Sequence, residues 1–409
     1  MAKPTIRFKG YTEDWEQRKL GDVLERRIEQ RQQSEEYPRL AFASGQGVIP
    51  LSERKTNNRE QLTKDEYTKK YLVTELNDIV YNPANVKYGA IDRNKCGRGL
   101  ISPIYVTFTT NEIPGFIERI VTSHDFQQRA LRFEEGTVTK RQSVNPEDLV
   151  TLDILVAPKR EEQQKIATYF DSLDHLITLH QRKCEETKIL KKYMLQKMFP
   201  QNGQKVPEIR FKGFTDDWEQ RKLGDLVDRV TRKNQDLVSE LPLTISAQYG
   251  LIDQNEFFDK RVASKDVSGY YLIENGEFAY NKSTSTDAPW GAIKRLDRYE
   301  NGVLSTLYIV FGIKENNPID SDFLVSYYST NLWHKGIHEI AAEGARNHGL
   351  LNIAPADFFE TKLMIPQDIE EQKKIGKYFE ELERLITLHQ RKCEELQNIK
   401  KFMLQNMFV

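Results

Sequence analysis

The segment LITLHQRKCEE at Leu176–Glu186 recurs letter for letter at Leu385–Glu395. In both copies, the apolar or small residues in and around it follow a 4,3,4,3,4 spacing. This spacing is the a/d seam of helices that pack along their length. The seam residues are Ile166, Phe170, Leu173, Ile177, His180 and Cys184 in the first copy and Ile375, Phe379, Leu382, Ile386, His389 and Cys393 in the second. Each segment therefore predicts a helix of about 39 residues, or about 58 Å at 1.5 Å per residue.

A second repeat opens each half of the chain. IRFKGYTEDWEQRKLGD at Ile6–Asp22 returns as IRFKGFTDDWEQRKLGD at Ile209–Asp225. The segments between the repeats are related more weakly, through DIVYN and YGAI in the first half and EFAYN and WGAI in the second. Solenoid repeats are about 20–50 residues long. The much larger spacing here predicts two domain-sized copies, each made of a divergent module and a nearly constant helix.

The repeats place the boundaries of this organisation. We predict a first module at 1–157, a long helix at 158–200, a linker with a second module at 201–365, and a C-terminal long helix at 366–409. The linker PQNGQKVP at Pro200–Pro207 is rich in turn residues and ends the first helix. The economical arrangement is antiparallel packing of the two helices, with the modules related by an approximate two-fold axis.

The modules themselves are predicted to be α/β (α+β) domains. Alternating apolar residues in GLISPIYVTF from Gly99, and over Val303–Phe311, predict one strand in each module. Phe323–Ala342 has the spacing of a helix.

The composition is that of a globular protein with 38% apolar and 30% charged residues. No apolar run approaches the eighteen or so residues that cross a bilayer, and the first residues lack a signal-peptide core, so a cytoplasmic protein is expected. The three cysteines, Cys96, Cys184 and Cys393, argue against a disulfide scaffold. The net charge of −1 excludes an overall basic field and limits nucleic-acid binding to a local surface.

A search for catalytic chemistry finds only fragments. NPAN at Asn82–Asn85 begins like an adenine-methyltransferase motif but lacks its second proline and its stacking aromatic residue. The histidines and cysteines of the helix seam could ligate zinc, but free cysteine usually packs as a small hydrophobe, so no metal site is predicted. The chain is therefore expected to be non-catalytic.

The segments that repeat resemble a known family. The EEQxKIxxYF start of each long helix, the VAP and MIP strand ends at Val156 and Met364, the LITLHQRK core and the WEQRKLGD segment are similar to the DNA-specificity subunit of type I restriction-modification enzymes. The resemblance covers the whole chain. It implies two target recognition domains, joined by two antiparallel helices, that read a bipartite duplex DNA sequence.

The same resemblance implies the partners. Two methyltransferase subunits would methylate adenine N6, and two restriction/translocase subunits would translocate and cleave DNA. S-adenosylmethionine, ATP and Mg are expected in those partners, with no cofactor in this chain. Two alternatives stay open: a two-armed protein-binding scaffold without DNA recognition, and a self-sufficient methyltransferase. The near-identity of the helices could also record a recent duplication or recombination.

Residue chemistry selects the candidate contacts, because Arg and Lys read guanine, Asn and Gln read adenine, and Lys and Arg bind phosphate. The DNA-binding candidates of the first module are Ser44, Gln46, Asn82, Asn85, Lys87, Tyr88, Lys140, Arg141 and Gln142. Those of the second are Gln248, Tyr249, Asn281, Lys282, Ser283, Thr284, Lys294, Arg295, Arg346, Asn347 and His348. The partner-docking candidates on the helices are Gln181, Arg182, Lys183, Gln390, Arg391 and Lys392.

Overall fold

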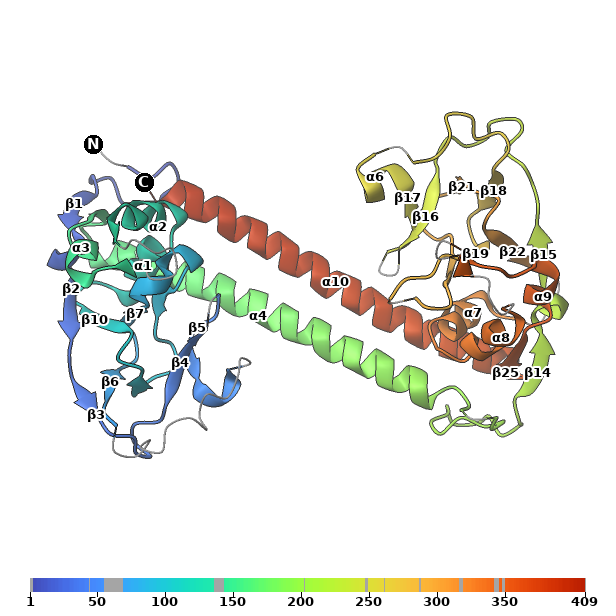
Figure 1. Ribbon diagram of the computed structural model, residues 1–409, viewed down its shortest axis with the longest axis horizontal. Coiled ribbons are helices and arrows are strands. Elements are labelled where there is room, and N and C mark those ends of the chain that lie inside the picture. The colour runs from blue at the N-terminus through green and yellow to red at the C-terminus, as the bar shows by residue number, and fades with distance from the viewer. Residues whose placement is uncertain are drawn as a thin grey trace. The chain divides into compact units, whose positions relative to one another are not determined.

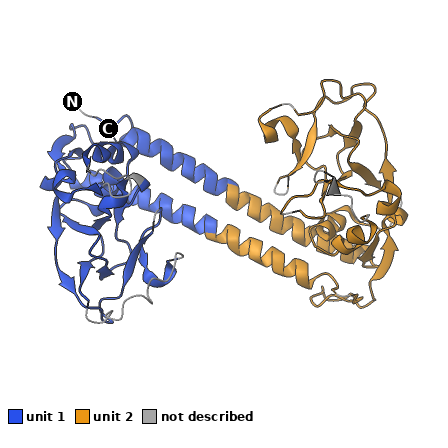
Figure 2. Cartoon of the chain, viewed as in Figure 1, with its two compact units in different colours: residues 1–181, 391–409 blue, residues 182–390 orange. Residues whose placement is uncertain are grey.

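The computed structural model describes residues 3–43, 45–54, 69–135, 143–201, 203–246, 249–260, 262–286, 288–315, 319–341, 346–347 and 350–408. The chain forms two compact units, with unit 1 made of Met1–Gln181 and Arg391–Val409 and unit 2 of Arg182–Gln390 (Figure 2). The unit boundaries fall within both long helices, α4 (Arg160–Lys197) and α10 (Ile369–Met407). Each unit therefore contains one module and a segment of each long helix. The predicted boundaries at 157, 200 and 365 stay predictions.

The module of unit 1 is built on a four-stranded antiparallel sheet in the order β2-β10-β7-β8 (Figure 1). These strands are β2 (Leu24–Arg27), β10 (Val106–Thr110), β7 (Ile79–Tyr81) and β8 (Ile91–Arg93). The smaller sheets pair β1 (Glu16–Lys19) with β13 (Asp153–Val156), β6 (Tyr71–Thr74) with β3 (Gln30–Arg31) and β9 (Gly99–Ile101), β4 (Leu40–Ala43) with β5 (Gly47–Pro50), and β11 (Glu134–Glu135) with β12 (Ser143–Val144). The helices are α1 (Pro114–Val121), α2 (His124–Ala130) and α3 (Pro146–Leu149), with 3-10 turns at Leu20–Asp22, Leu51–Glu53, Pro83–Tyr88 and Leu131–Phe133.

The module of unit 2 has a four-stranded sheet in the order β15-β22-β19-β20. These strands are β15 (Val227–Val230), β22 (Ile309–Ile313), β19 (Phe278–Asn281) and β20 (Ala292–Arg295). The smaller sheets pair β14 (Glu219–Lys222) with β25 (Lys362–Ile365), β16 (Leu243–Ser246) with β17 (Gly250–Asp253), β18 (Tyr271–Glu274) with β21 (Asn301–Leu304), and β23 (Arg346–Asn347) with β24 (Leu350–Leu351). The helices are α5 (Leu223–Leu226), α6 (Gln254–Phe258), α7 (Ser321–Tyr328), α8 (His334–Ile340) and α9 (Pro355–Phe359). In each main sheet, the strand that comes first in the sequence (β2 or β15) pairs with the strand that comes last in the sequence (β10 or β22). The two modules therefore share one strand order.

The helix seam belongs to the hydrophobic core of each unit. In unit 1, Phe170, Leu173 and Ile177 of α4 are buried with Leu396 and Met407 of α10. In unit 2, Ile375, Phe379 and Leu382 of α10 are buried with Met198 and Phe199. The predicted seam is therefore confirmed at these positions, whereas His180, His389 and Cys393 are only partly buried.

The two helix segments of each unit run antiparallel (Figure 1). In unit 1, Phe170 packs on Phe408 with ring centroids 6.1 Å apart, and Asp174 one turn later pairs with Lys400. In unit 2, Phe379 packs on Phe199 at 6.0 Å and Glu383 pairs with Lys191. A higher number on one helix thus meets a lower number on the other, as the antiparallel prediction requires.

Two predictions about the modules were wrong. The stretches expected to be single strands each form two, β9 and β10 in unit 1 and β21 and β22 in unit 2, separated by a turn that sends the chain to another sheet. The helix expected at Phe323–Ala342 is broken into α7 and α8, and Ala342 lies outside the described residues. Thr330 explains the break: its hydroxyl donates to the Tyr327 carbonyl at 2.7 Å and accepts from the Leu332 N–H at 3.2 Å. Such side-chain bonds replace the helical pattern.

Candidate nucleic-acid interface

Three loops meet at one end of the unit 1 module. Strand β4 runs parallel to β9 through the bridge between Arg39 and Leu100, so the turn at 102–105 lies beside the tip of the β4–β5 hairpin. The Phe42 and Tyr105 rings, from these two segments, stack at 6.0 Å. Strand β10 begins opposite the end of β7, which brings the loop after Tyr81 to the same end. The structure therefore collects the predicted segments around Gln46 and Asn82, which are far apart in the sequence.

The individual candidates of this end have different roles. The Asn82 side chain is buried and accepts the Ala84 N–H at 3.1 Å, so it shapes the loop. The Asn85 carbonyl accepts the Ala90 N–H at 3.2 Å. Gln46 and Tyr88 are exposed. Ser44 and Lys140, Arg141 and Gln142 lie outside the described residues, as does the side chain of Lys87.

Unit 2 repeats this arrangement with other residues. A parallel bridge between Pro242 and Val303 places the turn at 305–308 beside the tip of the β16–β17 hairpin. A further bridge joins Ser283 to Leu350, and the Lys282 carbonyl accepts the Leu351 N–H at 3.0 Å. The loop after β19 and strand β24 are thus neighbours. Both hairpin tips end in a glycine with positive φ, Gly47 at 71° and Gly250 at 73°, a conformation that favours glycine.

Several candidates of unit 2 lie at this end of its module. Tyr249 is exposed at the hairpin tip. Asn281 shapes its loop as Asn82 does, because its Oδ1 accepts the Ser283 N–H at 3.0 Å. Burial lowers the pKa of Lys282, and the nearby positive charge of Arg229 lowers it further. Ser283 is exposed and Thr284 is partly buried. Gln248 and His348, and the side chains of Arg346 and Asn347 in β23, lie outside the described residues.

Lys87, Lys294 and Arg295 are the cations expected to bind phosphate, and the last two already face other protein groups. Arg295 pairs with Asp297 at 2.5 Å and with Asp322 at 2.7 Å. Burial lowers the pKa of Lys294, and the charge of Lys191 lowers it further while that of Glu383 raises it, which places Lys294 near the long helices of unit 2. As phosphate contacts both remain predictions.

The docking candidates lie on exposed or half-buried parts of the helices. Gln181, Arg182, Lys183 and Arg391 are exposed, and Gln390 and Lys392 are half-buried. Arg182 pairs with Glu186 at 3.6 Å and Lys392 with Glu395 at 2.9 Å.

Two exposed aromatic side chains on the same helices were not predicted from the sequence, Tyr193 at 47% and Phe402 at 55% exposure. They occupy equivalent positions of the repeat, because both are followed by Met-Leu-Gln. This shared position in the repeat is the feature of the sequence from which the two residues could have been predicted.

The repeated opening segment proves to be a brace inside each unit. In unit 1 the Ile6 N–H donates to the Asn406 carbonyl at 2.8 Å, and Arg7 binds Glu162 in the first turn of α4 through two hydrogen bonds of 2.6 and 2.8 Å. In unit 2 the Ile209 N–H donates to the Lys197 carbonyl at 2.9 Å. There Arg210 binds Glu371 of α10 at 2.7 and 2.8 Å. The segment joins the start of one long helix to the end of the other.

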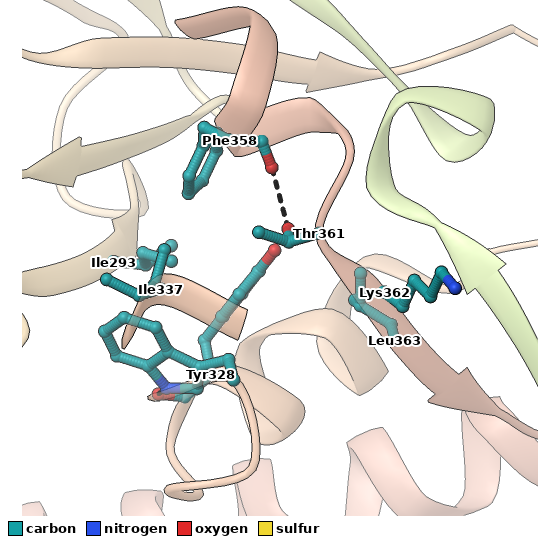
Figure 3. A pocket seen from close by; sticks show the side chains of 8 residues that line it. Ile293, Tyr328, Ile337, Phe358, Thr361, Lys362 and Leu363 are labelled. Carbon is teal, nitrogen blue, oxygen red and sulfur yellow. Dashed lines mark hydrogen bonds between the residues drawn. The ribbon is translucent and has the colours of Figure 1, made fainter. Parts of the chain in front are cut away.

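The core of unit 2 contains a small cavity with a volume of about 10 Å³, room for roughly one water molecule (Figure 3). It is lined by Tyr328, Trp333, Phe358 and Thr361 among others, and the Thr361 hydroxyl donates to the Phe358 carbonyl at 2.7 Å. This cavity is too small for a substrate.

Among the described residues, no group of three His, Cys, Asp or Glu side chains could hold a metal ion. Every helix among them is too short or too polar to cross a membrane.

Comparison with known proteins gives a family and a fold. Residues 215–398 match the family model described as the type I restriction modification DNA specificity domain. The S subunit of a type I restriction-modification system from M. genitalium has a similar fold over 100% of this chain and 99% of its own, with a TM-score of 0.61 and 14% identity. The HsdS subunit from Thermoanaerobacter tengcongensis is 15% identical over 97% of both chains, with a TM-score of 0.42. No curated protein sequence gives a significant match. The family model falls on the second copy of a sequence whose characteristic segments the first copy repeats, so the second half of the chain carries a type I restriction modification DNA specificity domain.

Proposed function

We propose that this chain is the DNA sequence-specificity subunit of a type I restriction-modification complex and reads a bipartite target. Each module would read one half-site through the loops at one end of its main sheet. The proposal rests on one observation. In each unit the same strand order brings three segments to one end of the module: the tip of the hairpin, the turn before the last strand of the main sheet, and the loop after β7 or β19. The residues that these loops present differ between the units, which suits two different half-sites.

The long helices would set the distance between the half-sites. Recognition modules on one face of a duplex must be separated by about 34–36 Å or a multiple of it. We propose that the antiparallel helices hold the two modules about an approximate two-fold axis at such a separation. Supporting this, α4 has 38 residues and α10 has 39, which is about 57–59 Å of helix each.

The partners would supply the chemistry. We propose that two methyltransferase subunits dock on the helices and methylate adenine N6, and that two restriction/translocase subunits join them. S-adenosylmethionine, ATP and Mg would be bound by these partners, and the present chain would be non-catalytic. The near-identical helix sequences support docking of the same partner twice, because they present one set of side chains at two places.

A genome-wide map of N6-methyladenine tests the proposal. Cells that express the methyltransferase subunits with and without this chain would be compared by single-molecule sequencing. We expect a two-part motif of fixed spacing only when the chain is present. Identical maps, with the partner expressed and bound, would contradict DNA recognition. Salt-dependent binding of the assembled complex to duplex DNA separates the same alternatives, since a protein scaffold predicts none.

A further inference from the structure

Both modules hold an exposed aliphatic side chain at the same place. Ile104 is 63% exposed in the turn between β9 and β10, and Leu307 is 54% exposed in the turn between β21 and β22. The surrounding sequences, SPIY and STLY, agree only in the first and last residues of the turn. An exposed aliphatic residue is ordinary when it occurs once. Its presence at one position of two divergent modules indicates a shared contact.

Hydrogen bonds and tyrosine contacts hold the turns that carry these side chains. In unit 1 the Tyr105 N–H donates to the Ser102 carbonyl at 3.0 Å, and the Tyr105 ring is fixed against Phe42. In unit 2 the Tyr308 N–H donates to the Ser305 carbonyl at 3.0 Å. Burial raises the pKa of Tyr308, and its side chain hydrogen-bonds Thr244 of β16. A rigid turn presents a contact without the entropy cost of ordering a mobile loop.

The position of the turns indicates which group contacts these two side chains. Each turn lies between the hairpin tip and the loop after β7 or β19, because β4 and β16 run parallel to the strand that precedes the turn. Ile104 and Leu307 are therefore in the middle of the loops that carry the proposed base contacts. An aliphatic side chain offers no hydrogen bond to a base edge. In the major groove, the apolar group that it can contact is the C5-methyl of thymine.

We infer that Ile104 and Leu307 are specificity residues, each packing on a thymine methyl group in one half-site. This inference rests on the proposed function. It assigns to each half-site one A·T pair read by apolar contact, beside bases read by the polar loop residues.

Deoxyuridine, which lacks only the methyl group of thymidine, provides the test. The complex of the full chain with its methyltransferase subunits would be titrated with duplexes that contain its methylation motif, with each thymine replaced in turn. We expect one replacement in each half-site to weaken binding about fourfold, the effect of losing one buried methyl-sized group. Ile104→Ala should remove the sensitivity in one half-site and Leu307→Ala in the other.

Leu76→Ala is the matched control, since Leu76 is an exposed aliphatic residue in the β6–β7 turn, at the other end of the strands. It should leave every affinity unchanged. The inference is overturned if either variant keeps the full deoxyuridine effect, or if it weakens thymine and deoxyuridine duplexes equally, as a wedge between base steps would. A wild-type complex without any sequence preference would instead refute the proposed function itself.

Discussion

Arg7 and Glu162 form a two-point ion pair across 155 residues of sequence, and the Glu162 carboxylate is 0% exposed. Arg210 and Glu371 repeat the pair in unit 2. The same segment bonds the last turn of the other long helix through Ile6 or Ile209. The opening segment is thus nearly identical in the two halves because it braces two helix ends in each unit.

Loss of this brace should destabilise one unit at a time. Arg7→Ala leaves a buried carboxylate without its partner, and such losses cost about 3–5 kcal/mol. We expect unit 1 to unfold at lower urea concentration while unit 2 keeps its transition, and Arg210→Ala to do the reverse. Lys9→Ala, an exposed cation two residues away, is the control and should change the free energy of unfolding by less than about 0.5 kcal/mol. Equal midpoints for Arg7→Ala and Lys9→Ala would show that the pair stabilises nothing.

In each unit a long helix packs closely on a short helix of the module, and the glycine that allows this contact lies on the long helix in unit 2 but on the short helix in unit 1. A Cβ on Gly376 of α10 would lie 2.7 Å from the Asp322 Cβ of α7, whereas in unit 1 the glycine is Gly115 of α1 and its Cβ would lie 2.9 Å from that of Ala167 on α4. Gly376→Ala should destabilise unit 2 by about 1–3 kcal/mol through overpacking.

Differential scanning calorimetry gives the comparison for this contact. Gly336→Ala in α8 is the control, because its Cβ would meet only Thr361 at an ordinary 3.5 Å, and it should stabilise slightly by helix propensity. The double variant Asp322→Gly with Gly376→Ala copies the arrangement of unit 1. Because Asp322→Gly also removes the ion pair with Arg295, the double variant is compared with Asp322→Gly alone, and Gly376→Ala should cost less in that background than in the wild type. An equal cost in both backgrounds would place the strain elsewhere, for example at the Phe323 backbone N, also 2.7 Å away.

The contribution of the Asp174 carboxylate to the free energy of unfolding should disappear at acidic pH. Burial raises the pKa of this carboxyl, but the hydrogen bond from Lys400 and the charges of Arg119 and Lys400 outweigh it, so the folded-state pKa is lowered. The unfolded chain then takes up the proton first as pH falls, and stability present above about pH 4 is lost below it. The difference in unfolding free energy between wild type and Asp174→Asn should be constant near pH 7 and shrink below pH 4. A pH-independent difference would contradict this, and Lys400→Met should reduce the effect.

Replacing the loop Asn281–Thr286 should change one half of the methylated motif, because the loop belongs to one module. Methylation mapping of cells that carry the variant measures this directly. Glu300→Gln is the control, an exposed change in the segment between β20 and β21 at the other end of these strands. Changes in both halves would contradict independent modules.

Tyr193 and Phe402 should each contribute to docking of one methyltransferase subunit. Exposed aromatic side chains are enriched at protein interfaces, and these two occupy the same repeat position. We expect Phe402→Ser or Tyr193→Ser to shift native mass spectra toward complexes with one partner copy, and the double variant to lose both. Ser172→Ala, on an exposed face of α4, should keep two copies. Two bound copies in the double variant would move the docking surface to the predicted residues Gln181–Lys183 and Gln390–Lys392.

What the sequence determined by itself is the organisation of the chain. Two repeats and an a/d seam are local patterns, and they predicted two modules and two long helices because a helix face is written in neighbouring residues. The seam residues Phe170 and Phe379 are buried as predicted. The family resemblance rests on the same local segments and is supported by the match over residues 215–398.

The tertiary structure decided which residues meet. The sequence predicted that Ile104 and Leu307 lie within strands. In the structure each lies in a turn, because the strand that follows belongs to a different sheet. In the sequence, only the Ser-Pro pair at 102–103 indicated a turn. Arg295 carries the chemistry of a phosphate contact, yet its charge is met by Asp322, which no local pattern predicts. The physical reason is common to these cases: the pairing of a charge or the exposure of an apolar side chain depends on groups distant in sequence, and only packing brings them within a few ångströms.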